Sequence, residues 1–165
     1  MNPISKRFEV EAEPYEFEFT SSNTALLVID MQRDFVSPGG FGEALGNDVS
    51  QVQDAIEPTQ GTLELARAVD MQVIFTREGH EPHLADCPRS KRNRGQNEVG
   101  IGDEGPMGQV LVRGERGHGI IDALEPRPDE IVLDKPGKGS FYATDLDLIL
   151  RNGGIENLIV TGVTT

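Results

Sequence analysis

Four short apolar runs along the chain have the pattern of buried strands. In the first, all residues from Ala25 to Ile29 are apolar, and Asp30 ends the run. A short, branched and unbroken apolar run is typical of a strand that is covered on both faces, as in a parallel sheet. The other three runs occupy about residues 71–76, 130–134 and 157–161.

Two helices are predicted between these strands. The first spans about residues 57–69, where Pro58 suits the first turn. The second begins near Thr144 and ends at Gly153. Both have apolar residues at helical spacing, namely Leu63, Ala66 and Val69 in the first and Leu146, Ile149 and Leu150 in the second. This order of elements is typical of an α/β fold with three layers, α/β/α, around a mostly parallel, doubly wound sheet.

Residues 1–20 have a different pattern. Apolar and acidic residues alternate over residues 8–19, which predicts an extended segment with one apolar face. Pro14 argues against a central position in a sheet. We expect residues 1–20 to be an N-terminal arm over the domain or over a neighbouring subunit, or else a partly ordered tail. Residues 21–165 would then belong to a single domain.

Residues 81–119 show no sustained periodicity and are rich in glycine, proline and charge. A loop region of this length is unusual unless it has a function. It contains a basic island in an acidic chain, formed by Arg89, Lys91, Arg92 and Arg94. Such an island is usually a solvated loop, and the more specific interpretation is a lid or a subunit contact.

Composition and charge limit the classes of function. The 165 residues carry a formal net charge of −13, which argues against nucleic-acid binding because that needs a basic face. No apolar run approaches the roughly 18–20 residues of a membrane span, and the N-terminus lacks the pattern of a signal peptide. A single cysteine fits a reducing compartment. We therefore expect a cytoplasmic protein without nucleic-acid or membrane partners.

Polar groups follow three of the predicted strands. Asp30 ends the first strand, the Arg77–His80 turn follows the second, and Lys135 and Lys138 follow the third. In open α/β sheets ligands bind beyond the carboxyl ends of the strands, so these groups should converge. A buried lysine beside a carboxylate is either a structural ion pair or a pair prepared for catalysis. The residues alone leave both open, and Asp30 could also merely cap a turn or helix.

Other reactive side chains are weaker candidates. Cys87 precedes Pro88, which disfavours the helical geometry that would activate a thiol. His80 and His83 lie in a loop without an evident third ligand, so we expect no metal site. We expect His118 to be a solvated loop residue.

Three motifs together resemble those of the isochorismatase-like cysteine hydrolases. They are Asp30-Met-Gln-Arg-Asp-Phe35 after the first strand, the turn at Lys135, and Val160-Thr-Gly-Val-Thr-Thr165. The resemblance runs from about residue 20 to the last residue. Within the family, four further segments look most like biuret amidohydrolases (biuret hydrolases): Thr76–His80, Ile101–Asp103, Arg113–Glu115 and Asp134–Phe141.

The resemblance implies an enzyme that cleaves small linear amides through an Asp–Lys–Cys triad and a covalent acyl-enzyme. Asp30 would accept the thiol proton, and Lys135 would steady the thiolate and orient Asp30. A cis peptide bond is implied between Val163 and Thr164, with the backbone N–H of Thr164 in an oxyanion hole. The residues implied to line the substrate pocket are Lys138, Phe35 and Glu78.

Two departures from the family pattern matter. The family's cysteine lies three positions beyond Thr165, so we expect the sequence to be the N-terminal portion of an active enzyme's domain. The Arg77–His80 turn lacks the aspartate of the metal-binding nicotinamidases, so we expect no metal and no cofactor.

The reaction implied by the resemblance is the hydrolysis of biuret to carboxyurea and ammonia. The family also suggests a homo-oligomer, commonly a tetramer. Alternative enzymes are a ureidoacrylate or other N-carbamoyl amidohydrolase and an isochorismatase. The alternative of another class is a non-catalytic binding subunit that keeps the fold.

Overall fold

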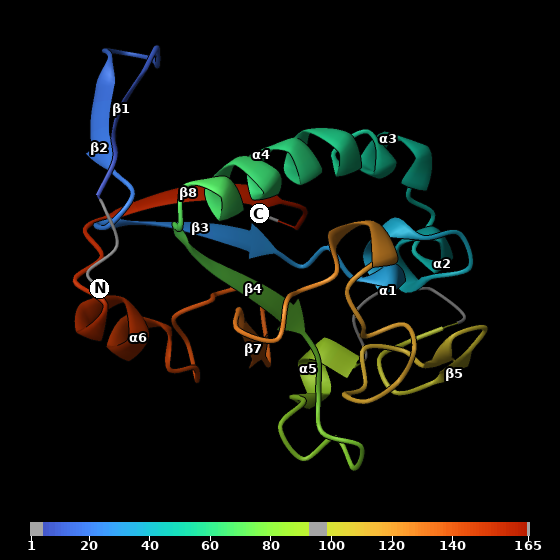
Figure 1. The fold of residues 1–165 in the computed structure, drawn as a ribbon. Helices are drawn as coiled ribbons and strands as arrows, with labels where there is room; N and C mark the ends of the chain where they lie inside the picture. The colour runs from blue at the N-terminus through green and yellow to red at the C-terminus, as the bar shows by residue number, and fades with distance from the viewer. Residues whose placement is uncertain (1–4, 93–98, 165) are drawn as a thin grey trace.

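The sheet predicted by the apolar runs is present in the computed structural model, which describes residues 5–92 and 99–164 (Figure 1). Its four strands are all parallel, in the order β7-β4-β3-β8. The strands are β3 (Thr24–Ile29), β4 (Gln72–Glu78), β7 (Ile131–Lys135) and β8 (Asn157–Gly162). All four predicted strands are confirmed, with only small differences at their ends.

The two predicted helices are also confirmed, as α4 (Ile56–Ala68) and α6 (Leu146–Asn152). The shorter helices are α1 (Arg33–Val36), α2 (Phe41–Ala44), α3 (Val49–Gln53), α5 (Arg89–Arg92) and the 3₁₀ turn η1 (Asp122–Leu124). The remaining strands are β1 (Arg7–Val10), β2 (Phe17–Thr20), β5 (Glu104–Gly105) and β6 (Gly108–Gln109). In the described part of the chain, no helix has the length and apolar character needed to cross a membrane.

Helices cover both faces of the sheet, which confirms the α/β/α class. Helix α4 lies on one face and α6 on the other (Figure 1). Side chains of a strand alternate between the two faces, so Leu26 and Val28 join the core beneath α4. Ala25 and Leu27 join the core beneath α6. This double coverage is the physical reason for the unbroken apolar run in β3.

The strand order reverses between β3 and β8. From β3 the chain passes through α4 to the neighbouring strand β4 and continues outward to β7. Helix α6 then carries it back across the sheet to β8, on the other side of β3. In such sheets the ligand crevice lies beyond the carboxyl ends of the strands at this switch point. The residues that follow β3 and β8 are therefore the first place to look for a site.

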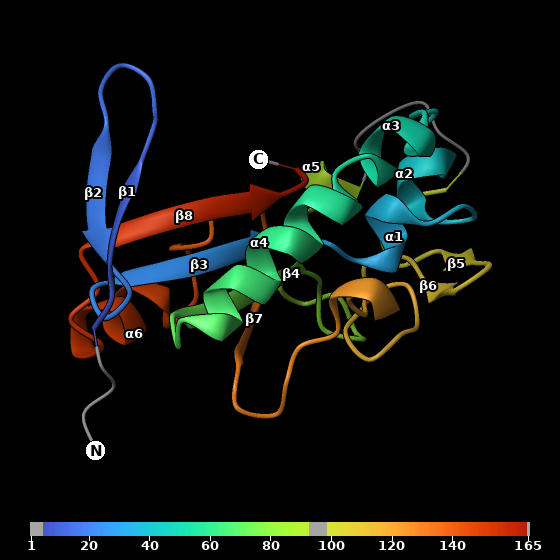
Figure 2. The ribbon, with the colours of Figure 1, turned by 45° about the horizontal axis from the view of Figure 1, so that its top comes forward.

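The N-terminal segment is extended, as its period of two predicts, but it pairs with itself. Strands β1 and β2 form an antiparallel hairpin that projects from the body of the molecule (Figure 2). Phe8 and Phe19 stack at its base, with ring centroids 5.4 Å apart. Tyr15 near the tip is 70% exposed. Contact of this arm with a neighbouring subunit, and a homotetramer, stay predictions.

The long connection between β4 and β7 is anchored to α1. The backbone N–H groups of Arg33 and Asp34 donate to the carbonyl oxygens of Gly119 and Gly117 at 2.9 and 2.8 Å. The buried Asp34 carboxylate accepts from the N–H of Leu111 at 3.0 Å. Burial raises the pKa of Asp34 above its ordinary value. The loop is therefore held against the carboxyl ends of the strands.

We predict that the core beneath α6 depends on Leu146 and not on Leu148 of the same helix. Leu146 is fully buried, whereas Leu148 is 57% exposed. Leu146→Ala should lower the free energy of unfolding by about 2–5 kcal/mol, because it leaves a cavity. Leu148→Ala is the matched control and should change it by less than about 0.5 kcal/mol. Urea denaturation measures both, and equal losses would contradict the packing described for α6.

Candidate active site

A buried ion pair joins Asp30 to Lys135. The Lys135 Nζ donates to Asp30 Oδ2 at 2.7 Å, and neither residue is exposed to solvent. The same ammonium donates to the carbonyl oxygen of Gly137 at 2.9 Å. The structure thus brings together two residues from β7 and the end of β3, which are separated by β4. Breaking such a pair by removing one partner is strongly destabilising, since it leaves a buried charge uncompensated.

Two hydroxyl groups fix the Asp30 carboxylate. Thr76 Oγ1 donates to Oδ1 at 2.8 Å, and Thr164 Oγ1 donates to Oδ2 at 2.7 Å. Asp30 and Thr164 both have left-handed backbone conformations, with φ of 49° and 62°. This region is uncommon for residues other than glycine and exceptional for a β-branched one, and such strain gathers at functional sites. The carboxylate is therefore held in one orientation at the switch point of the sheet.

The structure corrects the expected cis bond before Thr164. Within the described residues, the cis peptide bond is Glu13–Pro14, so the Val163–Thr164 bond is trans. A cis bond before a residue other than proline costs about 3–4 kcal/mol and persists only where the surroundings enforce it.

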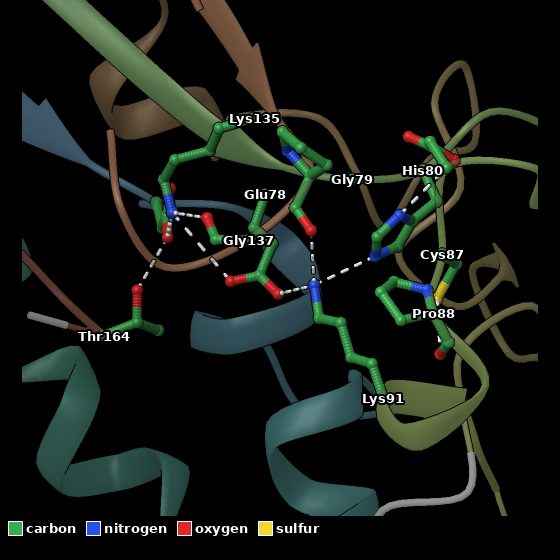
Figure 3. A network of polar contacts seen from close by, with 12 residues as sticks. Glu78, Gly79, His80, Cys87, Pro88, Lys91, Lys135, Gly137 and Thr164 are labelled. Atoms are coloured by element: carbon green, nitrogen blue, oxygen red, sulfur yellow. Dashed lines mark hydrogen bonds and ion pairs between the residues drawn. The ribbon is translucent and has the colours of Figure 1, made fainter. Parts of the chain in front are cut away.

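Glu78 faces Lys135 from the end of β4 (Figure 3). Its carboxylate is buried, with Oε2 3.9 Å from Lys135 Nζ and Oε1 2.6 Å from Lys91 Nζ. Lys91 belongs to α5, so the interpretation of the basic island as merely solvated is wrong for this residue. Its side chain is only 20% exposed, because three acceptors draw it inward. Arg94 lies outside the described residues.

A cavity of about 440 Å³ opens beside these groups. All four residues predicted to line the pocket or form the oxyanion hole border it: Phe35, Glu78, Lys138 and Thr164. Sequence reasoning did not assign Lys91 or Arg92 to the pocket, although it noted their charge. The apolar part of the wall includes Phe41, Leu45, Ile101 and Leu111. The cavity therefore combines an apolar wall with charged groups at one end.

Gln32 ties the end of β4 to the long loop. Its Nε2 donates to the carbonyl oxygens of Glu78 and His118 at 2.9 and 3.0 Å. Its Oε1 accepts from the N–H of Glu78 at 2.7 Å. Gln32 is fully buried, and its only sequence signal was its place in the motif after Asp30. This side chain sets the position of Glu78 through the backbone.

The expectation that His118 is solvated is wrong, since its exposed fraction is 2%. The imidazole packs against Gly79, where a Cβ would overlap the ring. A residue with a side chain at position 79 would therefore displace His118. Packing therefore explains the glycine in the Thr76–His80 motif. The burial of His118 depends on the absence of a side chain at position 79.

A second ion pair lies between β4 and β7. Arg77 donates to both carboxylate oxygens of Asp134, at 2.7 and 3.0 Å, and His118 Nε2 lies 3.4 Å from Asp134 Oδ1. Burial alone would raise the pKa of Asp134, but the contacts with His118 and Arg77 lower it to about 2. Arg77 and Asp134 thus link the two adjacent strands, one position before the pair Glu78 and Lys135.

The weaker candidates Cys87, His80 and His83 do not border the cavity. Cys87 is buried in an apolar cluster with Ile101, Val110 and Leu111. His83 is exposed, and His80 is buried next to Asp86 and Lys91. In residues 5–92 and 99–164, no three His, Cys, Asp or Glu side chains are grouped so that they could hold a metal ion.

Comparison with known proteins gives one family. The family model described as "Isochorismatase domain" matches residues 24–165. Ureidoacrylate amidohydrolase RutB of Pantoea ananatis is 34% identical over 158 residues, covering 93% of this chain and 63% of the relative. The RutB of Yersinia enterocolitica is also 34% identical, covering 94% of this chain and 70% of the relative.

A solved structure shares the fold. The crystal structure of a cysteine hydrolase from Pseudomonas syringae pv. phaseolicola superimposes with a TM-score of 0.72 at 28% identity. The match covers 88% of this chain and 62% of the solved chain. The chain thus spans about two thirds of the length of the proteins that it matches.

We predict that the Arg77–Asp134 pair stabilises the fold in a pH-dependent way. Asp134→Asn should lower the free energy of unfolding by about 1–3 kcal/mol at neutral pH. Because the folded-state pKa is depressed, the wild-type advantage should be complete above about pH 4 and decline towards about pH 2.

Urea denaturation at several pH values measures this difference. Asp147→Asn is the control, because it removes a carboxylate from the exposed pair with Arg151 and should change neither stability nor its pH dependence. A constant difference between wild type and Asp134→Asn down to pH 2 would contradict the assignment.

Proposed function

The chain belongs to the isochorismatase family, and we propose that the complete protein is an amidohydrolase that cleaves a C–N bond of a small ureido compound. The observation that carries the proposal is the buried Asp30–Lys135 pair, whose carboxylate also receives a hydrogen bond from Thr164 at the edge of the cavity. The arrangement provides a fixed proton acceptor next to a cation, which acyl transfer from an amide requires.

The nucleophile in this proposal is a cysteine three positions after Thr165 in the complete protein. Asp30 takes the thiol proton, and the thiolate attacks the carbonyl carbon of the amide. The tetrahedral intermediate expels ammonia, which takes that proton from Asp30, and an acyl-enzyme remains. Water then hydrolyses the thioester, with Asp30 again as the base.

Each remaining residue has a proposed part in this sequence of steps. Lys135 orients Asp30, and its charge stabilises the thiolate. The backbone N–H of Thr164 donates to the developing oxyanion. Phe35 packs against the substrate, while Glu78 and Lys138 supply an acceptor and a donor for its polar groups.

Biuret is the substrate that we propose first. It is small and neutral, and it offers both N–H donors and carbonyl oxygens, which match the carboxylate of Glu78 and the ammonium of Lys138. Two segments support this choice. The Thr76–His80 segment contributes Glu78 to the wall of the cavity, and the turn with two lysines contributes Lys138.

An anionic ureido acid such as ureidoacrylate is the second candidate. The relatives named above are ureidoacrylate amidohydrolases. Among the charged residues that line the cavity, Lys91 is paired with Glu78, which leaves the positive charges of Arg92 and Lys138. This local excess in a chain of net charge −13 would attract a substrate carboxylate.

We predict that Asp30→Asn abolishes turnover. The amide is close in size to the carboxylate but cannot accept a proton, so ammonia release from the preferred substrate should fall by about 10³-fold or more. The assay uses the full-length protein with biuret and ureidoacrylate. Substantial activity of the variant would refute the role of Asp30, and a wild type that binds a ureido compound without releasing ammonia would be a binding subunit.

The effect of Lys138→Gln should distinguish the two substrates. The change removes one charge and keeps a donor of similar length. If the substrate carries a carboxylate, KM should rise about tenfold or more, with kcat little changed. For a neutral substrate such as biuret, KM should rise by less than about threefold. Arg151→Gln, on the exposed face of α6, is the control and should leave KM unchanged for both substrates.

A further inference from the structure

We propose that Lys91 is a positioning residue of this site. It holds Glu78 and the turn that carries Lys135, and it thereby directs the Lys135 ammonium to Asp30. The inference rests on the proposed amidohydrolase function, because it assigns the part that Lys91 has in that reaction. Lys91 comes from α5, in the basic island of the long loop that follows β4.

The Lys91 ammonium has three close partners, two hydrogen-bond acceptors and one carboxylate. They are Glu78 Oε1 at 2.6 Å and His80 Nε2 at 2.9 Å (Figure 3), and the carbonyl oxygen of Pro136 at 2.8 Å. A lysine ammonium has three donors and no acceptor, so two hydrogen bonds and an ion pair hold it from three sides. The side chain therefore has one defined position between the end of β4 and the turn after β7.

The contact between Lys91 and Glu78 determines which carboxylate Lys135 pairs with. Lys135 Nζ lies 2.7 Å from Asp30 Oδ2 and 3.9 Å from Glu78 Oε2. A buried Glu78 without Lys91 would be an uncompensated charge, and Lys135 is the cation beside it. With its own cation, Glu78 does not compete for Lys135. The Lys135–Asp30 pair thus depends on Lys91.

The contact with Pro136 acts on the same pair through the backbone. Pro136 follows Lys135 directly, and the next carbonyl oxygen, that of Gly137, accepts from Lys135 Nζ at 2.9 Å. Lys91 therefore fixes the start of a turn that bends back onto the Lys135 side chain. Loss of Lys91 would remove both the support of this turn and the cation that compensates Glu78.

His80 supports this geometry as a neutral acceptor. Burial and the charge of Lys91 lower the pKa of His80, against the opposite effects of Asp86 and Glu78. A neutral imidazole can accept the Lys91 hydrogen bond at Nε2, with Nδ1 towards Asp86 at 3.5 Å. The three acceptors thus favour a cation at the position of the Lys91 ammonium.

A purely structural brace would show the same contacts, so the test must separate the two roles. In the full-length protein, Lys91→Met should lower kcat by about 10- to 100-fold and change KM less than about threefold. Lys91→Arg keeps the charge and should retain most of the activity. In the Glu78→Gln background, Lys91→Met should have little further effect on kcat, because no carboxylate then competes for Lys135.

Arg89→Met is the matched control on the same helix. Arg89 is exposed, so its loss should leave kcat and KM unchanged. Equal losses from Lys91→Met in the wild-type and Glu78→Gln backgrounds would overturn the proposal, as would a loss confined to KM.

Crystal structures of the full-length Lys91→Met and Lys91→Arg variants provide a readout without turnover. In Lys91→Met we expect Lys135 Nζ to leave Asp30 and approach Glu78, and in Lys91→Arg to stay on Asp30. Lys135 remaining on Asp30 in Lys91→Met would overturn the proposal whether or not the protein hydrolyses ureido compounds. Absence of ammonia release from the wild type would refute the proposed function alone.

Discussion

The buried Lys135–Asp30 pair is the interaction on which the geometry of the site depends. Two charges removed from water are tolerated only where their attraction and further hydrogen bonds offset the desolvation. The sheet meets this demand through its register, since Thr76 lies opposite Ile29 and Glu78 lies opposite Lys135. A shift of one residue would turn these side chains to the other face. The register of the strands therefore also fixes the geometry of the site.

Charges of opposite sign alternate away from Asp30 through Lys135 and Glu78 to Lys91. The sequence of four charges is neutral as a whole, which lowers the cost of burying it. Asp30 directly follows β3, Lys135 and Glu78 belong to β7 and β4, and Lys91 comes from the long loop. The loop is therefore part of the site's electrostatics, and the anchoring of the loop on α1 contributes to the geometry at Asp30.

Most of the fold could be predicted because its signals are local, whereas the site could be predicted only in part. The apolar runs of β3 and β8 mark buried strands, and the meeting of Asp30 with Lys135 follows from parallel strands that end at one edge. Lys91 and His118 gave no such signal, because their burial depends on partners distant in sequence, such as Glu78 and Gly79.

The charge of the whole chain and the charge of the cavity act over different distances. A net charge of −13 repels anions, but salt screens that repulsion beyond about 8 Å at physiological ionic strength. Within the cavity, Arg92 and Lys138 are nearer to a ligand than most of the surface carboxylates. Recognition of a charged substrate would thus be decided at the rim, while bond cleavage would be decided at the buried pair.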